Sequence, residues 1–417
     1  EERQEEEKEE REQGRQAAAM TPTRRALATT LALTAALATA PTTAQAADTP
    51  QHPWYFDTMR VEEMWQHTTG EGITIAVIDT GVDPTLPELQ GQVLEGADVM
   101  SDGAGYDVDL DAHGTDIAAL IAGTGSAEGI QGIAPGAKIL PIRSSSRSSI
   151  FSVDKIPGAI EYAIDAGAQI INISLGGPDL GNEQEAFHAA LTAAARDDVL
   201  IFASAGNSAQ EGNAPSSPAS LDGVVGVAAV GDGNQRAPYS AHGPHVTLAA
   251  PGDNVPGHCG DLTGPACLRE EGGTSSATAL ASASAALIWS QHPDWTKNQV
   301  LRVMLNTAER PDDQRRDDYT GYGIVRPDRV VIDGEGDPGD PDSPPIFRDW
   351  EAGLVPPVTP EPTPETTPDD SAEPAPGPEA DAAATSENSG PLPWILGGTA
   401  AVLVVAVTGW VLYRRRV

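Results

Sequence analysis

Short apolar runs rich in β-branched residues alternate with helical patterns through the middle of this chain. The predicted strands are residues 73–78, 138–142, 169–174, 199–204 and 224–230. The predicted helices are residues 115–121, 154–166, 183–196, 276–291 and 297–307. Apolar strands separated by helices indicate a parallel sheet with helices on both of its faces. The sequence therefore predicts one α/β domain over residues 47–332.

Polar groups stand at the carboxyl ends of several predicted strands. Asp79 follows the first strand, the segment 174–176 ends the third, and Asn207 lies shortly after the fourth. The carboxyl ends of parallel strands lie along one edge of the sheet, where functional residues gather. We therefore expect these groups to meet at that edge.

A histidine and a serine stand where helices are predicted to begin. His113 opens the segment His-Gly-Thr, and Ser275 lies within Gly-Gly-Thr-Ser-Ser-Ala-Thr at residues 272–278. A serine hydroxyl is a poor nucleophile unless a positioned base removes its proton. Asp79, His113 and Ser275 supply an acid, a base and a nucleophile in the order Asp, His, Ser, and chain order distinguishes one kind of catalytic triad from another.

Each of these segments also fits a structural role. Gly-Thr-Ser is a common helix start, Asp before Thr-Gly is a common turn after a strand, and His-Gly-Thr can precede a capped helix. The combination of all three in this order favours the catalytic interpretation. Ser276 is out of register with the motif and is interpreted as structural.

The body resembles the subtilisin-like serine proteases, and more narrowly the mycosins, the membrane-anchored subtilases associated with actinobacterial type VII secretion. The matching motifs are Val77-Ile78-Asp79-Thr80-Gly81-Val82-Asp83, His113-Gly114-Thr115, Asn172-Ile173-Ser174-Leu175-Gly176, Ala205-Gly206-Asn207 and Gly273-Thr274-Ser275-Ser276-Ala277-Thr278. The resemblance implies a subtilisin-like α/β fold, with a parallel sheet covered by helices on both faces, and hydrolysis of peptide bonds.

The resemblance also implies a role for each matching residue. Ser275 would be the nucleophile, His113 the general base and then acid, and Asp79 the group that orients and stabilises the imidazolium. Asn207 would donate its side-chain amide to the oxyanion, together with the backbone N–H of Ser275. The residues implied to pair with the substrate backbone as an added strand are Ser174, Leu175 and Gly176.

The amino-terminal end differs from the body in composition. Residues 1–19 are an acidic, disordered extension that we interpret as lying upstream of the true start. Residues 20–46 have the basic start, apolar middle and small-residue cleavage site of a secretory signal peptide. We therefore expect the body to be exported.

The carboxyl-terminal end has the composition of a tether and an anchor. Residues 333–390 are dense in Pro and acidic residues and predict a disordered linker, with the apolar island 346–350 inside it. Residues 391–413 form an apolar stretch long enough to span a bilayer, and the tail 414–417 begins with three arginines. This predicts a single-pass cell-membrane protein with an extracytoplasmic body and a cytoplasmic C-terminus.

Cys259 and Cys267 lie close together in the sequence, ahead of Ser275. In an exported chain they predict a disulfide, which would contribute roughly 2–3 kcal/mol in the loop-entropy model. Two free thiols are disfavoured by the compartment. A metal site is disfavoured because the other ligands would come from scattered histidines.

Other titratable residues near the motifs have competing interpretations. Asp116 either caps the helix that His113 opens or biases the titration of that histidine. Residues 107–111, Asp-x-Asp-x-Asp, hint at a calcium loop but lack its glycine and distal glutamate. Asp109 and Asp111 are therefore interpreted as turn or surface carboxylates, and no cofactor is required. The histidines outside the motifs are interpreted as structural or exposed.

The expected function is an extracytoplasmic serine endopeptidase with a polypeptide substrate and type VII secretion membrane components as partners. An alternative is a catalytically silent structural subunit of the secretion complex. An esterase of the α/β-hydrolase type is disfavoured because Ser275 lacks a Gly-x-Ser-x-Gly elbow. The net charge of −36 argues against a nucleic-acid partner.

Overall fold

The computed structural model describes residues 49–100, 104–150, 152–177, 183–310 and 315–354. The predicted signal peptide, most of the predicted linker and the predicted transmembrane segment lie outside these ranges. Within the described residues, no helix has both the length and the apolar character needed to cross a bilayer.

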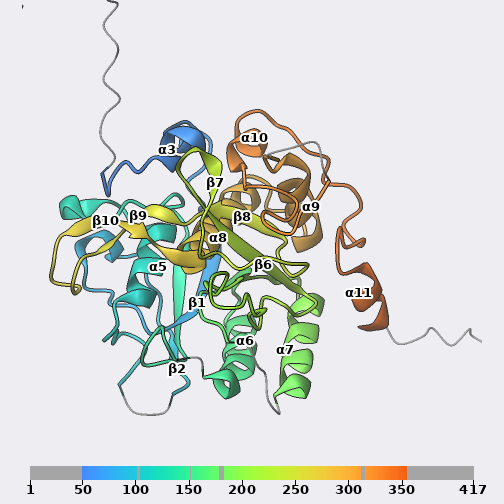
Figure 1. The fold of residues 1–417 in the computed structure, drawn as a ribbon, viewed down its shortest axis with the longest axis horizontal. Coiled ribbons are helices and arrows are strands. Elements are labelled where there is room, and N and C mark those ends of the chain that lie inside the picture. Colours follow the sequence, from blue (N-terminus) through green and yellow to red (C-terminus); the bar gives the residue numbers. More distant parts are fainter. Residues whose placement is uncertain (1–48, 101–103, 151, 178–182, 311–314, 355–417) are drawn as a thin grey trace, which may run out of the picture. The chain divides into compact units, whose positions relative to one another are not determined.

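A mainly parallel sheet forms the centre of the domain (Figure 1). In spatial order its strands are β2 (Ala97–Asp98), β3 (Lys138–Arg143), β1 (Thr74–Asp79), β4 (Ile170–Ile173), β5 (Leu200–Ser204), β6 (Val224–Gly231) and β7 (Gln235–Arg236). β8 (Leu248–Pro251) also pairs with β6 in parallel, whereas β7 runs antiparallel to it. The strands predicted from the apolar runs are confirmed, with small shifts at their ends.

The two faces of the sheet have separate hydrophobic cores, because successive strand residues point to opposite sides. Ile75 and Val77 of β1 belong to one core, and Ala76 and Ile78 belong to the other. Side chains of α5 (His113–Ala122) and α8 (Gly273–Gln291) fill the first core. Side chains of α6 (Ile156–Asp165) and α7 (Gln184–Arg196) fill the second. Burial on both faces explains why these strands are apolar along their whole length.

The helix α8 lies at the centre of the domain and consists largely of alanine and serine. It contacts β4, β5, β6 and β8 of the sheet, and also α5, α9 (Lys297–Thr307) and α10 (Pro327–Val331). Some of its buried hydroxyls are satisfied within the helix: Thr278 donates to the carbonyl of Thr274, and Ser284 donates to that of Leu280, both at 2.7 Å. Ser282 instead donates to Asn172 Oδ1 on β4 at 3.1 Å. A helix of small side chains can therefore approach the sheet closely without leaving hydroxyls unpaired.

Several elements were not predicted from the sequence. The short helices α3 (Tyr55–Thr58) and α4 (Val61–Met64) precede the sheet, and 3₁₀ turns occur at η1 (Pro87–Leu89), η2 (Ser126–Glu128), η3 (Val153–Lys155) and η4 (Asp232–Asn234). The strands β9 (Asp253–His258) and β10 (Ala266–Glu271) form an antiparallel hairpin. A disulfide joins Cys259 to Cys267 at the end of this hairpin, with a Cα–Cα distance of 5.9 Å.

Residues 333–354, which we call the strap, pack on the body and end in α11 (Arg348–Leu354) (Figure 1). Ile346 packs against the core on one face of the sheet, and Trp350 packs against the core on the other. Lys297 Nζ lies 2.8 Å from Glu351 Oε1. The structure thus differs from the predicted disordered linker over its first part, because Ile346 and Trp350 of the apolar island 346–350 pack, half-buried, against the domain.

Candidate active site

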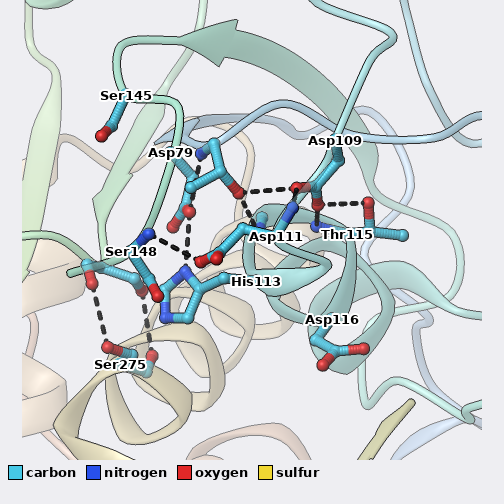
Figure 2. A network of polar contacts seen from close by, with 12 residues as sticks. Asp79, Asp109, Asp111, His113, Thr115, Asp116, Ser145, Ser148 and Ser275 are labelled. Atoms are coloured by element: carbon cyan, nitrogen blue, oxygen red, sulfur yellow. Dashed lines mark hydrogen bonds and ion pairs between the residues drawn. The ribbon is translucent and has the colours of Figure 1, made fainter. Parts of the chain in front are cut away.

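Asp79 and His113 form the innermost pair of the site. Asp79 is the last residue of β1 and is fully buried, whereas His113 begins α5 and its side chain is 18% exposed. His113 Nδ1 lies 2.7 Å from Asp79 Oδ1 (Figure 2). Because a carboxylate faces Nδ1, this nitrogen carries the ring proton, and Nε2 keeps a free lone pair.

The environment of His113 makes it a stronger base than an ordinary histidine. Burial by itself lowers the pKa of the ring, but the charge of Asp79 and the hydrogen bond to it outweigh burial, so the pKa of His113 is raised above 6.5. Asp79 Oδ1 also accepts from the N–H of Thr80 at 2.8 Å, while no donor among the described residues reaches Asp79 Oδ2. The negative charge is therefore only partly compensated and acts strongly on the imidazole.

Ser275 lies in the first turn of α8, on the other side of the imidazole from Asp79 (Figure 2). Its hydroxyl donates to the backbone oxygen of Ser174 at 2.9 Å, and the Ser174 hydroxyl donates to the backbone oxygen of Ser275 at 3.0 Å. The serine proton therefore points at Ser174 in this rotamer. A rotation about the Cα–Cβ bond would turn it towards His113, a step consistent with catalytic hydrogen bonds that tighten only when substrate binds.

The side-chain amide of Asn207 is oriented by the residue before Ser275. Asn207 Oδ1 accepts from both the backbone N–H and the hydroxyl of Thr274, each at 2.9 Å. With the oxygen engaged in this way, Nδ2 remains as a donor. A Cβ atom on Gly273 would lie 3.0 Å from Nδ2, so glycine keeps the space beside the amide open. Thr274 was missed as a positioning residue, and its only signal in the sequence was its place in the motif.

The predicted substrate segment continues β4 towards Ser275. Ser174 and Leu175 are buried, and Gly176 is exposed. The next residue, Gly177, forms two backbone hydrogen bonds with Ser217, at 3.1 and 2.7 Å. The segment therefore has a fixed backbone beside the serine, while its pairing with a substrate stays a prediction.

Asp109 fixes the start of α5. Its Oδ2 accepts from the N–H of Thr115 at 2.9 Å and from the Thr115 hydroxyl at 2.6 Å. Its Oδ1 accepts from the N–H of Ala112 at 3.0 Å and from the hydroxyl of Thr80 at 2.9 Å. Of the two interpretations of Asp109, turn or surface carboxylate, the structure confirms the turn, because Oδ1 accepts from the N–H groups of Asp111 and Ala112, and it adds that both oxygens hold the start of the helix that carries His113. Within the described residues, no group of three or more His, Cys, Asp or Glu side chains is arranged to hold a metal ion.

Two further sequence candidates lie close to the site without joining the triad. Asp111 accepts from the backbone N–H of Ser148 at 2.6 Å, which links the two loops on either side of His113 (Figure 2). Ser276 is buried, and its hydroxyl donates to the backbone oxygen of Gly272 at 2.9 Å. The hydroxyl of Ser276 is therefore engaged with the backbone at the start of α8.

A buried charged cluster surrounds Asp116, three residues after His113 on α5. His258 Nδ1 lies 2.7 Å from Asp116 Oδ1, and His258 Nε2 lies 3.1 Å from Glu88 Oε1. Arg269 forms a second ion pair with Asp116. Burial alone would lower the pKa of His258, but its hydrogen bonds to the two carboxylates raise it to about 9. The helix-cap interpretation of Asp116 is wrong, and the charge of Asp116 contributes to the raised pKa of His113.

Comparison with known proteins places the chain among the subtilases. The model of the subtilase family, peptidase S8, matches residues 70–323. A thermostable alkaline protease of Halalkalibacterium halodurans is 34% identical over 239 residues, which cover 57% of this chain and 63% of that protein. The chain thus spans about three-fifths of the length of the curated relatives it matches.

Solved structures of type VII secretion proteins have the same fold. The MycP3 protease from the type VII (ESX-3) secretion system has a TM-score of 0.59 and 30% identity, covering 70% of this chain and 90% of that one. A chain of the periplasmic assembly from the ESX-5 inner membrane complex has a TM-score of 0.60 and 28% identity, covering 72% of this chain and 88% of that one. Because the family model matches more than half of the 417 residues, the chain belongs to the subtilase family.

Proposed function

We propose that this chain is an extracytoplasmic, membrane-anchored serine endopeptidase that uses Asp79, His113 and Ser275 as its triad. The observation that carries the proposal is the 2.7 Å contact between His113 Nδ1 and the buried Asp79 carboxylate, with Ser275 on the opposite side of the ring. This arrangement leaves His113 Nε2 as a base directed towards the serine.

The proposed reaction begins when Ser275 Oγ attacks the carbonyl carbon of the scissile peptide bond. His113 Nε2 takes the hydroxyl proton, and Asp79 stabilises the imidazolium that results. The carbonyl oxygen becomes an oxyanion, which accepts hydrogen bonds from Asn207 Nδ2 and the backbone N–H of Ser275. His113 then gives its proton to the leaving amine. A water molecule, activated by the same imidazole, hydrolyses the acyl-enzyme and restores the serine.

The hydrogen bonds between Ser174 and Ser275 describe the resting state of this cycle. When the serine turns to His113, the backbone oxygen of Ser174 loses its donor and becomes free to accept an N–H from the substrate backbone. Substrate binding and activation of the nucleophile would then occur together, and Ser174, Leu175 and Gly176 would form one wall of the peptide-binding cleft.

Location and partners rest on the ends of the chain and on the relatives. The predicted signal peptide at 20–46 and the span at 391–413 would place the body outside the membrane, with the linker shortened to 355–390 by the packed strap. The relatives named above include a protease from the type VII (ESX-3) secretion system and a chain of the ESX-5 inner membrane complex. A homologous role would make type VII membrane components the partners and a secreted polypeptide the substrate.

Peptide hydrolysis by the purified full-length chain tests this proposal. Wild type and Ser276→Ala should both cleave an unfolded protein such as casein, whereas Ser275→Ala should not. If wild type is inactive and Ser275→Ala still supports secretion in cells that lack the wild type, the chain acts instead as a silent structural subunit.

A further inference from the structure

The turn that precedes Ser275, which we call the nucleophile turn, is held by hydrogen bonds with residues outside the triad. The backbone N–H of Gly273 donates to Tyr239 Oη at 3.1 Å, and that of Gly272 donates to the carbonyl of Gly252 at 2.9 Å. Gly273 has a left-handed backbone with φ of +86°. A contact that fixes this peptide also fixes the direction in which Thr274 and Ser275 leave the turn.

The hydroxyl of Tyr239 is oriented by a carboxylate. Two acceptors lie within reach of it, Asp253 Oδ1 and, at 3.1 Å, the backbone oxygen of Gly252, and its single proton is donated to the nearer carboxylate in a short hydrogen bond. Its lone pairs therefore remain for the N–H of Gly273. Burial and the neighbouring Asp253 raise the pKa of Tyr239, so the hydroxyl stays protonated over the working pH range. The acceptor at Gly273 thus has one defined orientation.

Asp253 is in turn held by the segment that precedes the sheet. The indole N–H of Trp54 donates to the backbone oxygen of Asp253 at 2.9 Å, and Trp54 is only 7% exposed. Trp54 lies before residue 70, where the match to the subtilase family begins. The series of contacts that supports the nucleophile turn therefore includes a residue outside the region that the family model matches.

We propose that Tyr239 is a positioning residue for the nucleophile turn and that Trp54 anchors it through Asp253. This inference rests on the proposed peptidase function. Tyr239 would affect both the oxyanion donor and the nucleophile. Gly273, which it contacts, is followed by Thr274, which orients the Asn207 amide, and then by Ser275 itself. Loss of the Tyr239 hydroxyl would let the Gly273 peptide rotate and loosen the oxyanion donors and the nucleophile together.

The substitution Tyr239→Phe in the full-length chain tests the inference. It removes one hydrogen bond to the turn, and we expect kcat to fall about tenfold with KM within about twofold of wild type. Trp54→Phe, which removes the anchor one step further away, should lower kcat about two- to threefold. Tyr55→Phe is the matched control: Tyr55 is fully buried, and no partner for its hydroxyl lies among the described residues, so kcat should not change.

Two measurements separate positioning from stability and from failure of the proposed function. If the loss of kcat in Tyr239→Phe disappears when the assay is run well below the melting temperature of the variant, the loss reflects stability and the inference is overturned. Wild-type kcat in Tyr239→Phe also overturns it. Neither result affects the proposed peptidase function. If wild type neither cleaves peptides nor reacts with a fluorophosphonate, the proposed function fails. Amide hydrogen exchange of the peptide covering residues 272–275 then decides: faster exchange in Tyr239→Phe than in Tyr55→Phe supports positioning, and equal exchange overturns it.

Discussion

At the scale of single residues, the titration of His113 follows from the buried carboxylate that faces its Nδ1. Desolvation favours the neutral ring, and the charge of Asp79 favours the protonated ring by more. The general base must be neutral to accept the proton of Ser275. In the proposed mechanism, the raised pKa would make His113 a stronger base and shift the acid limb of activity to higher pH.

The first prediction concerns this acid limb. Because the pKa of His113 is raised above 6.5, kcat/KM should rise with pH through an apparent pKa above 6.5. Asp79→Asn should move that limb to lower pH and reduce kcat by about 10⁴-fold, the order of loss seen when the triad acid is removed or neutralised in serine proteases. A pH–rate profile measures both effects. A wild-type acid limb below pH 6 would contradict the role assigned to Asp79.

The second prediction concerns the oxyanion. Asn207→Ala should lower kcat by about 10²–10³-fold with little change in KM, because the amide acts on charge that develops only in the transition state. Thr274→Val should have a smaller effect, since it removes only one of the two hydrogen bonds that orient the amide. Asn234→Ala, which loses a contact with Glu309, is the control and should leave kcat unchanged. A rise in KM at unchanged kcat would exclude the oxyanion role.

Asp79, His113, Asn207 and Ser275 could be named from the sequence as candidate site residues, because the proposed chemistry restricts their residue types and their chain order. Tyr239 and the backbone oxygen of Ser174 could not. Their roles depend on which atoms lie near Ser275 in space, and a tyrosine or a carbonyl group has no distinctive local pattern. The turn at Asp109 was predicted, but its hydrogen bonds with Thr80 and Thr115 were not, because those donors lie outside the local turn pattern.

At the scale of secondary structure, α5 is held by carboxylates at two places. Asp109 binds its amino-terminal end, and Asp116 binds it to the β9–β10 hairpin through His258 and Arg269. His113 stands at the start of this helix, so both contacts limit its movement relative to Asp79. The hairpin that supplies His258 and Arg269 is closed by the disulfide between Cys259 and Cys267.

The third prediction concerns the pH dependence of stability. The folded-state pKa of His258 is about 9, against 6.5 for an ordinary histidine, so its contribution is fully present below pH 6.5 and is lost as pH rises through 9. The linkage amounts to about 3 kcal/mol at most. The free energy of unfolding in urea should therefore fall from pH 6.5 to pH 9.5 in wild type and fall much less in His258→Gln. The exposed His188→Gln is the control and should behave as wild type. An equal fall in His258→Gln would show that other groups cause the pH dependence.

The long apolar strands and the helices around them were predictable because burial on both faces leaves a strong sequence pattern. The hairpin β9–β10 was not, since its residues are mixed in polarity and its pairing is with another strand of similar composition. β8 is short and ends in proline, so its sequence resembles that of a loop. Tertiary contacts determine these elements more than local preference does.

At the scale of the whole molecule, the strap joins the catalytic body to the segment that leads towards the predicted membrane anchor. Trp350 fits against Gly223, where a Cβ atom would lie 2.6 Å from the indole ring. The composition of the strap and the segment after it predicted disorder, since proline and acidic residues dominate residues 333–390. Its first part is nevertheless bound to the domain by two apolar side chains, Ile346 and Trp350, and by polar contacts that include the ion pair of Lys297 with Glu351.

The fourth prediction concerns this strap. Trp350→Ala should lower the free energy of unfolding by about 1–2 kcal/mol, the value of a half-buried aromatic side chain, and leave kcat unchanged. A chain that ends at residue 354 should unfold at the same temperature as the full-length chain, and one that ends at residue 332 should unfold at a lower temperature. Thermal unfolding measures all three. Equal melting temperatures for the two shortened chains would show that the strap adds nothing to stability.

The most direct measurement is the identification of the residue that reacts with a fluorophosphonate in the full-length chain. Mass spectrometry of the digested adduct should find the probe on Ser275 alone. Labelling should disappear in Ser275→Ala and become much slower in His113→Ala, because the imidazole activates the hydroxyl. An adduct on Ser276, or labelling that survives in Ser275→Ala, would contradict the assignment of Ser275 as the nucleophile that His113 and Asp79 activate.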